Sequence, residues 1–166
     1  MNNYSVKDYK TTHFEYKSLD KIHGATTIDS LLRIFRHLKL NAQCVLTTLG
    51  EGQLGYIDLV LSDAAYTAIP NSAPFARPLD PRALIITTKK KDKIAQQQVN
   101  HNDEKQQYNV CQSVQQALRK QIIDVIPVEY LDDLRNTGTD MINDSISDMI
   151  QYLQTNFGRV TDQCSV

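Results

Sequence analysis

The chain has 166 residues, of which 41% are hydrophobic, and its formal net charge at pH 7 is −1. This length can bury one sizeable core, arranged as one domain or two small lobes. The near-neutral charge excludes a dedicated nucleic-acid binder, which needs a concentrated basic face. No run approaches the roughly 18 apolar residues of a membrane-spanning helix, so we expect no membrane partner.

The start of the chain and its cysteines indicate the compartment. Residues 1–5 are polar and lack the apolar region of a signal peptide, which predicts a cytoplasmic localisation, with the nucleus as the other compartment left open. Cys44, Cys111 and Cys164 are too few and too scattered for a disulfide framework or a metal site of the CxxC type. We therefore expect reduced, structural thiols.

An N-terminal arm and one helix are predicted first. Residues 1–25 carry aromatic residues among charges without helical spacing, which predicts an arm with room for one short strand, around residues 13–16, or a hairpin. Apolar residues then recur at three- and four-residue steps, which predicts a first helix over residues 28–46, with Thr26 or Thr27 as its N-cap. Its apolar stripe consists of Ile28, Leu31, Leu32, Phe35, Leu38, Ala42 and Val45.

Residues 47–91 are predicted to be a region of turns and a proline-rich loop. Residues 57–61 alternate apolar and other side chains, as an extended segment does, and a short helical stretch is expected over residues 62–69. Residues 70–81 contain four prolines, which remove backbone donors and forbid a helix. The fold is therefore expected to depend on the helices predicted before and after this region, over residues 28–46 and 92–160.

Residues 92–160 are predicted to form one long helix followed by short helices, and residues 161–166 a tail. The glutamine-rich stretch, residues 95–107, has good helix formers and little apolar surface. Pro127 should stop the long helix, Asn143 or Ser145 should cap the last one, and Gly158 should end it in a left-handed conformation. The three apolar stripes are Cys111, Val114, Leu118, Ile122 and Val125; Val128, Leu131 and Leu134; and Ile142, Ile146, Met149, Ile150, Leu153 and Phe157.

Such stripes predict the fold class. Amphipathic helices joined by short links cannot bury their apolar faces separately, so they pack together. We expect an all-α fold, with one helical lobe over residues 26–160. Its shared core should contain Leu118, Ile122, Leu131, Ile146, Ile150 and Leu153.

Residues 50–55 match the GxGxxG string of nucleotide-binding loops. A dinucleotide site needs a strand before this string, a helix opening on it and an acidic ribose ligand about twenty residues later. Here an amphipathic helix precedes the string and prolines occupy the ribose-ligand region, and the other motifs of a kinase do not occur. The run is interpreted as a turn, and no cofactor is expected.

The remaining polar residues give no catalytic or metal-binding constellation. The four histidines, at positions 13, 23, 37 and 101, share no metal-ligand spacing with one another or with the cysteines. Asp132 and Asp133 are adjacent and point about 100° apart on a helix, so with Glu129 they indicate a solvated face rather than paired carboxylates. We expect no enzyme, no catalytic residue and no metal site.

Several segments in the same order resemble the Gag-like region of copia-type LTR retrotransposon polyproteins. They consist of packing and turn residues and are spread over most of the chain from Phe14 onward; they are residues 19–24, 38–42, 48–50, 55–66, 117–122, 130–136 and 152–161. The resemblance implies a capsid-type helical lobe that self-associates into a shell around element RNA. In that family the polyprotein continues into a second helical lobe, often a zinc knuckle, and enzymes.

The expected function is therefore a structural, Gag-like capsid protein of an LTR retrotransposon, or a host-retained derivative, whose partner is another copy of itself. The alternative is a helical adaptor module that binds another protein. RNA contact is expected to be weak, salt-sensitive and made mainly by regions outside this chain. Within the chain the candidate residues for it are Lys89, Lys90, Lys91 and Lys93.

Overall fold

The computed structural model describes residues 6–158, so the predicted tail and Cys164 lie outside the described residues. Its elements are α1 (Val6–Thr12), α2 (Ile28–Gln43), α3 (Asp63–Thr67), α4 (Lys91–Val125) and α5 (Ile146–Phe157), with 3-10 turns η1 (Leu49–Gly52), η2 (Ile57–Leu59), η3 (Val128–Tyr130) and η4 (Asp132–Leu134). Strand pairing within residues 6–158 is limited to one isolated bridge, between Arg135 and Ile142. The all-α class is confirmed.

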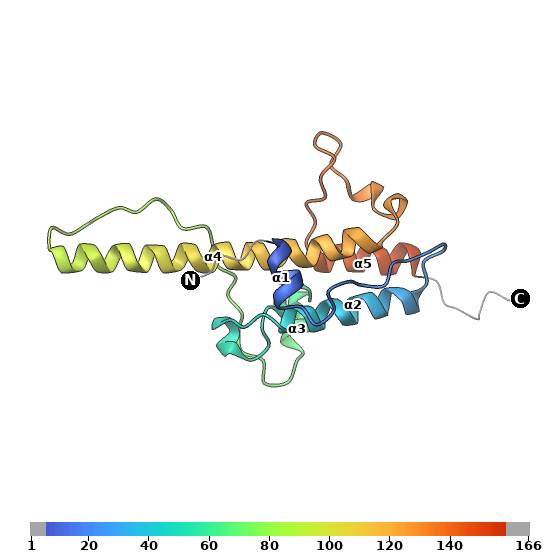
Figure 1. The fold of residues 1–166 in the computed structure, drawn as a ribbon, viewed down its shortest axis with the longest axis horizontal. Helices are drawn as coiled ribbons and strands as arrows, with labels where there is room; N and C mark the ends of the chain where they lie inside the picture. Colours follow the sequence, from blue (N-terminus) through green and yellow to red (C-terminus); the bar gives the residue numbers. More distant parts are fainter. Residues whose placement is uncertain (1–5, 159–166) are drawn as a thin grey trace, which may run out of the picture.

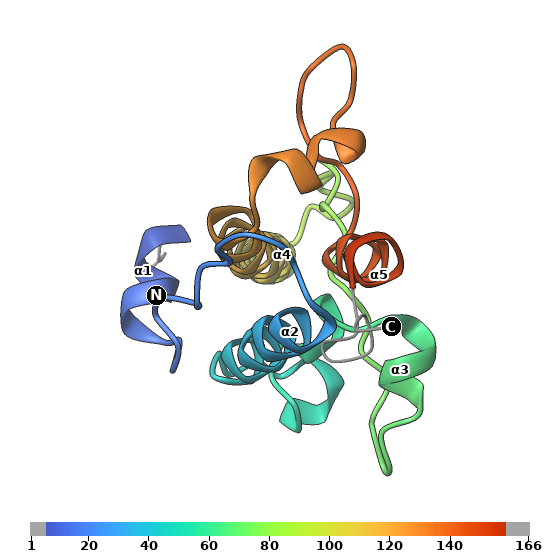
Figure 2. The ribbon, with the colours of Figure 1, turned by 90° about the vertical axis from the view of Figure 1, so that its right-hand side faces the viewer.

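Three helices surround the core. α2 packs against α5 and against the second half of α4, and α1 packs on another side of α4. Seen end-on, α2, α4 and α5 form a triangle with α1 outside it (Figure 2). Of the six predicted core residues, Leu118, Ile122, Leu131, Ile146 and Leu153 have no exposed surface, whereas Ile150 is only partly buried. The periodicity therefore located the core, with Ile150 at its edge.

α4 is a single helix of 35 residues, and its two halves have different surroundings. Its second half lies in the core, whereas its first half projects from the packed helices (Figure 1). The buried residues of α4 begin at Cys111, and within residues 91–110 none is buried. The helix ends at Val125, just before Pro127, as predicted. The glutamine-rich stretch is helical and contributes almost nothing to the core.

Side-chain caps fix where the shorter helices begin. Thr27 caps α2, and its hydroxyl accepts from the backbone N–H of Ser30 while the Ser30 hydroxyl accepts from that of Thr27, which is a capping box. Ser145, rather than Asn143, caps α5. Gly158 follows α5 with φ −74°, so the predicted left-handed ending is wrong. The chain leaves α5 extended, with the Gly158 N–H bonded to the Gln154 carbonyl at 3.3 Å.

The start of the described chain corrects one prediction. Residues 6–12 form α1 rather than an unstructured arm, and residues 13–16 form no strand. Tyr9 and Phe14 are each 3% exposed and belong to the core. A seven-residue helix is unstable by itself, so its stability comes from packing on α4 rather than from local periodicity.

The segment that follows α2 is also more helical than predicted. Residues 57–59 form η2 rather than an extended segment, because their backbone N–H groups are bonded within turns rather than to another strand. Gly55, with φ +56°, makes this geometry possible, since a Cβ there would lie 2.9 Å from backbone atoms of Ala42 and Gln43. Ser62 caps α3, so the helix begins where the short helical stretch was predicted. It ends at Thr67, two residues earlier than predicted.

Residues 128–142 differ from the predicted second helical stripe. They form η3 and η4 and then a turn closed by the bridge between Arg135 and Ile142. Leu131 is fully buried, but Val128 is 61% exposed. Three apolar residues at helical spacing can belong to two short 3-10 turns, which direct only some of them inward.

A buried amide pair joins three parts of the chain. Asn41 of α2 is fully buried; its Nδ2 donates to the Gln121 Oε1 of α4 at 2.8 Å and to the Tyr16 carbonyl at 2.9 Å, and its Oδ1 accepts from the Tyr16 N–H at 2.8 Å. Gln121 Nε2 also donates to the Tyr16 carbonyl, at 3.0 Å. These bonds hold the segment after α1 against both helices, since buried polar groups need partners.

Candidate functional site

The predicted lysine cluster lies where the proline-rich loop enters α4. Lys89, Lys90, Lys91 and Lys93 are all exposed, and Lys90 is the N-cap residue of α4 without a side-chain cap bond. The exposed amides at the start of a helix carry partial positive charge, which adds to that of the lysines. This end of α4 lies far from the packed helices (Figure 1). The site can attract phosphate groups electrostatically, and Asp92 in the same turn reduces its net charge.

An extended segment, residues 82–88, runs beside the projecting half of α4 (Figure 1), and we call it the strap. The Gln97 Nε2 donates to the Thr87 Oγ1 at 2.8 Å, which holds the strap to the helix. The strap carries three adjacent apolar residues, Leu84, Ile85 and Ile86, which are 37%, 77% and 46% exposed. Nearby, Leu79 and Val99 are 85% and 51% exposed. This part of the molecule combines an unusual amount of apolar surface with the lysines.

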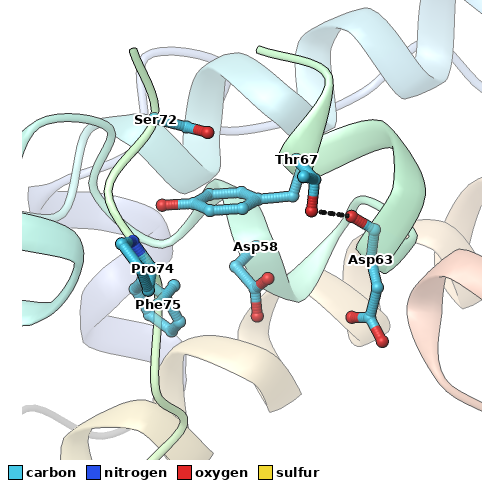
Figure 3. Close-up of a pocket in the computed structure, with 7 residues that line it drawn as sticks. Asp58, Asp63, Thr67, Ser72, Pro74 and Phe75 are labelled. Carbon is cyan, nitrogen blue, oxygen red and sulfur yellow. Dashed lines mark hydrogen bonds between the residues drawn. The ribbon is translucent and has the colours of Figure 1, made fainter. Parts of the chain in front are cut away.

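A first hollow, of about 260 Å³, lies between η2, α3 and the loop after it (Figure 3). The Asp58 carboxylate is 8% exposed and accepts from the Arg77 Nε at 2.7 Å, while Arg77 also donates to the Asp58 carbonyl at 2.7 Å. The Tyr66 hydroxyl donates to the Ala73 carbonyl at 2.6 Å. Asp58, Arg77 and Tyr66 thus fix the proline-rich loop to the helical body, which is a structural task.

A second hollow, of about 420 Å³, lies between α2, α5 and the start of α3. Its apolar lining includes Leu32, which is 50% exposed, and the partly buried Ile150. Its polar lining comes from Lys39 and from serine and glutamine side chains. The lining suits an apolar side chain from a partner better than a charged small molecule.

The glycine run forms a turn, as predicted. Gly50, Gly52 and Gly55 all have positive φ, and Glu51 between them has φ 57°. The run follows α2 and leads into η2, whereas a dinucleotide loop joins a strand to a helix. Each glycine here serves the backbone path from α2 back toward the body.

The other candidate polar residues are dispersed. Among residues 6–158, no three His, Cys, Asp or Glu side chains come together as metal ligands would. His37 stacks on Tyr16 with ring centroids 3.9 Å apart. Asp132 pairs with Arg135 at 3.5 Å, and Asp133 accepts from the Tyr152 hydroxyl at 3.2 Å, so the two adjacent carboxylates have separate partners. Across the same stretch, every helix is too short or too polar to cross a membrane.

Cys111 is the most protected thiol that the structure describes. It is 2% exposed, and burial raises its pKa from 9.0 to about 11, with smaller opposing effects of Arg77 and Asp58. A thiol that stays protonated at neutral pH is a poor nucleophile. Cys111 therefore acts as a small apolar core residue.

In the variant Cys44→Ser with Cys164→Ser, we expect Cys111 to resist a thiol reagent at pH 8 and to react fully in denaturant. Stability should fall as pH rises from about 9 to about 11, because the unfolded thiol loses its proton in this window before the folded one does. Labelling followed by mass spectrometry measures the first effect. Urea midpoints at both pH values, compared with those of Cys111→Ala, isolate the second, and fast labelling of the folded chain would contradict the prediction.

The lysine cluster was predicted from the sequence, whereas the strap was not. Leu84, Ile85 and Ile86 stand directly after the proline-rich residues 70–81, and the sequence prediction included them in the turn and loop region over residues 47–91. The signal was present, since a β-branched apolar run between a proline and a lysine cluster is typical of a strand. Residues 82–88 are assigned neither to a helix nor to a strand, and they pair with no strand among the described residues.

Comparisons with known proteins do not extend this description. No protein-family model matches the chain, and no curated protein and no solved structure matches it either.

Proposed function

We propose that this chain is a structural protein of the Gag-like capsid type, from an LTR retrotransposon or a host-retained derivative, and that it self-associates through helical surfaces. Two lines of support exist. The first is the ordered resemblance to the Gag-like region of copia-type elements. The second is the division of the molecule into a helical body with its own core and a projecting half of α4.

The projecting half of α4 is the observation that carries the proposal. Helix propensity alone barely stabilises such a segment in water, so it persists as a continuation of the packed second half. None of residues 91–110 is fully buried within one copy, and of them only Val110 is a partly buried apolar residue packed against the described core, so most of their surface lies outside it. Surface of that kind is free to form contacts between copies, and symmetric contacts are the usual outcome when a protein binds itself.

A second candidate function is an adaptor that binds another protein. The hollow between α2, α3 and α5 favours it, because an apolar side chain of a partner helix fits a depression lined by Leu32 and Ile150. The two functions differ in what the purified chain does alone. Only the capsid-type function requires it to associate with itself.

We expect the average mass of the purified chain to rise with concentration between micromolar and millimolar, and particles to form at high salt. High salt screens the like charges of the lysines and strengthens apolar contact, so it should favour assembly. Light scattering across a concentration series measures this directly. A strict monomer up to millimolar concentration, without particles at high salt, would contradict the capsid-type function and leave the adaptor.

We expect weak, salt-sensitive RNA binding that depends on the four lysines. With at most four phosphates neutralised, the slope of log K against log salt should be no steeper than about −3 for single-stranded RNA. Replacing Lys89, Lys90, Lys91 and Lys93 by alanine should bring this slope close to zero, whereas replacing the exposed Lys17 and Lys120 should change it little. Filter binding at several salt concentrations measures the slope, and tight binding that persists at high salt would show the prediction to be wrong.

A further inference from the structure

The strap is neither helical nor paired with another segment among the described residues. Within the described residues, backbone hydrogen bonds are absent from residues 82–87, and the Lys90 N–H bonds only to the Thr88 side chain. Ile85, Ile86, Thr87 and Thr88 are β-branched, which favours extended backbone. An exposed extended segment with free N–H and C=O groups is a template for strand pairing with another chain.

Resting on the proposed self-association, we propose that the strap pairs with the strap of a second copy as an antiparallel two-stranded ribbon with its two-fold axis at Ile85. A two-fold axis joins the same surface of both copies, so one segment supplies both sides of the contact. The strap lies beside the projecting half of α4 and clear of the packed helices, so pairing leaves both bodies intact (Figure 1).

The side-chain pattern of the strap favours registers in which outward-facing residues of one copy lie opposite outward-facing residues of the other. We call these the even registers. Ile85 is 77% exposed, whereas its neighbours Leu84 and Ile86 are 37% and 46% exposed, so Ile85 points away from the helix. Residues opposite each other in a strand pair share one face, and a shift of one residue would set Ile85 against an inward-facing residue. The two Ile85 side chains therefore meet on the outer face, and Leu84 of each copy lies opposite Ile86 of the other.

Charge then selects one register among the even ones and identifies the second copy as the occupant. With the axis at Ile85, Arg82 lies opposite Thr88, and just beyond each end of the paired residues Asp80 of one copy lies across from Lys90 of the other, which gives two symmetric pairs of opposite charge. A shift of the axis to Ile86 sets Arg82 against Lys90, and a parallel pairing sets the lysines of both copies against one another. Both of these arrangements are disfavoured by repulsion between like charges.

Pro81 and the start of α4 limit the ribbon to a short length. Proline has no N–H to donate, and from Lys91 the backbone is helical. Two short paired strands form a small interface, so this contact is weak, and because it is two-fold it joins two copies only. A larger assembly needs a further contact on another surface of the chain.

The test uses the full chain at low salt, where the pairs of opposite charge are little screened, and exchanges the two charges. Asp80→Lys and Lys90→Asp each convert both symmetric pairs into like-charge pairs, so we expect each to weaken association about tenfold. Together they restore opposite charges across the axis, so the double variant should associate within about twofold of the original chain. The matched controls are Lys105→Asp and Asp103→Lys, at exposed positions on the projecting half of α4. They make the same charge changes away from the strap and should leave association unchanged.

A cross-link checks the register. In a Cys164→Ser background, Ile85→Cys should form a disulfide between two copies under mild oxidation, whereas Val99→Cys, exposed on the projecting helix, should not. Sedimentation equilibrium and thermal melts of all variants separate association from folding. If the original chain associates but the single charge exchanges have no effect, or the double variant does not recover, the paired strap is wrong and self-association stands. A strictly monomeric original chain overturns both.

Discussion

Replacing Leu118 by alanine is expected to lower the free energy of unfolding by about 2 to 5 kcal/mol. Leu118 has no exposed surface and lies on the buried stripe of α4, between Val114 and Ile122. Alanine there loses the transfer free energy of the side chain and leaves a cavity that packed neighbours fill only in part. A domain of this size has roughly 5 to 15 kcal/mol of stability in total, so the loss is a large share of it.

Urea denaturation monitored by circular dichroism measures this loss, and two variants calibrate it. Gln107→Ala, on the exposed projecting half of the same helix, should change stability by no more than about 0.5 kcal/mol. Ile150→Ala should fall between the two, because Ile150 is only partly buried at the edge of the core. Equal midpoints for Leu118→Ala and Gln107→Ala would mean that the buried stripe of α4 is not the core.

Replacing Asn41 by alanine is expected to cost about 2 to 4 kcal/mol, an effect close to that of a core leucine. The Asn41 side chain is fully buried and makes three hydrogen bonds: the one to Gln121 is buried, and the two to the Tyr16 backbone are partly buried. Without it, the buried Gln121 Oε1 and the partly buried Tyr16 N–H lose these partners. The cost is thus set by the groups left behind rather than by the bonds removed.

A double-mutant cycle with Gln121→Ala tests this explanation. We expect a coupling free energy between Asn41 and Gln121 of about 0.5 to 3 kcal/mol, since they share one network. Asn41→Leu, which keeps the volume of the side chain, should remain destabilising, and the exposed Asn100→Ala should be almost neutral. Additive losses at positions 41 and 121 would contradict a cooperative network.

Helical periodicity predicted those parts of the fold that show a repeating apolar pattern in the sequence. The stripes of α2, the second half of α4 and α5 repeat over several turns, and most of their buried residues are among those that the sequence indicated. The exceptions are Ile34, Asn41, Ala117 and Gln121, which are buried but were not predicted, and Leu32, which was predicted and is 50% exposed. Short elements gave no such signal. α1 has seven residues and η2 has three, and both are held by packing on distant elements, which a local pattern cannot report.

The candidate site was predicted only in its charged part. A cluster of lysines can be read directly from the sequence, so the cluster at residues 89–93 was predicted. Its distance from the packed helices became clear only from the structure, in which α4 is one continuous helix. The strap was not predicted because its short apolar run follows four prolines, which indicated a loop. The link between Asn41 and Gln121 joins positions 80 residues apart, and pairs at such separation leave no trace in one sequence.

The continuity of α4 also makes it a ruler. One residue adds about 1.5 Å of length and about 100° of rotation to a helix, and the 35 residues of α4 span about 52 Å. The number of residues in α4 therefore fixes the direction in which the lysines and the strap face relative to the core. Inserting a single residue into the projecting half would hardly change its reach, yet it would turn this end of the molecule by more than a quarter of a revolution. The length of one helix thus sets both the distance of the lysine end from the core and its rotation about the helix axis.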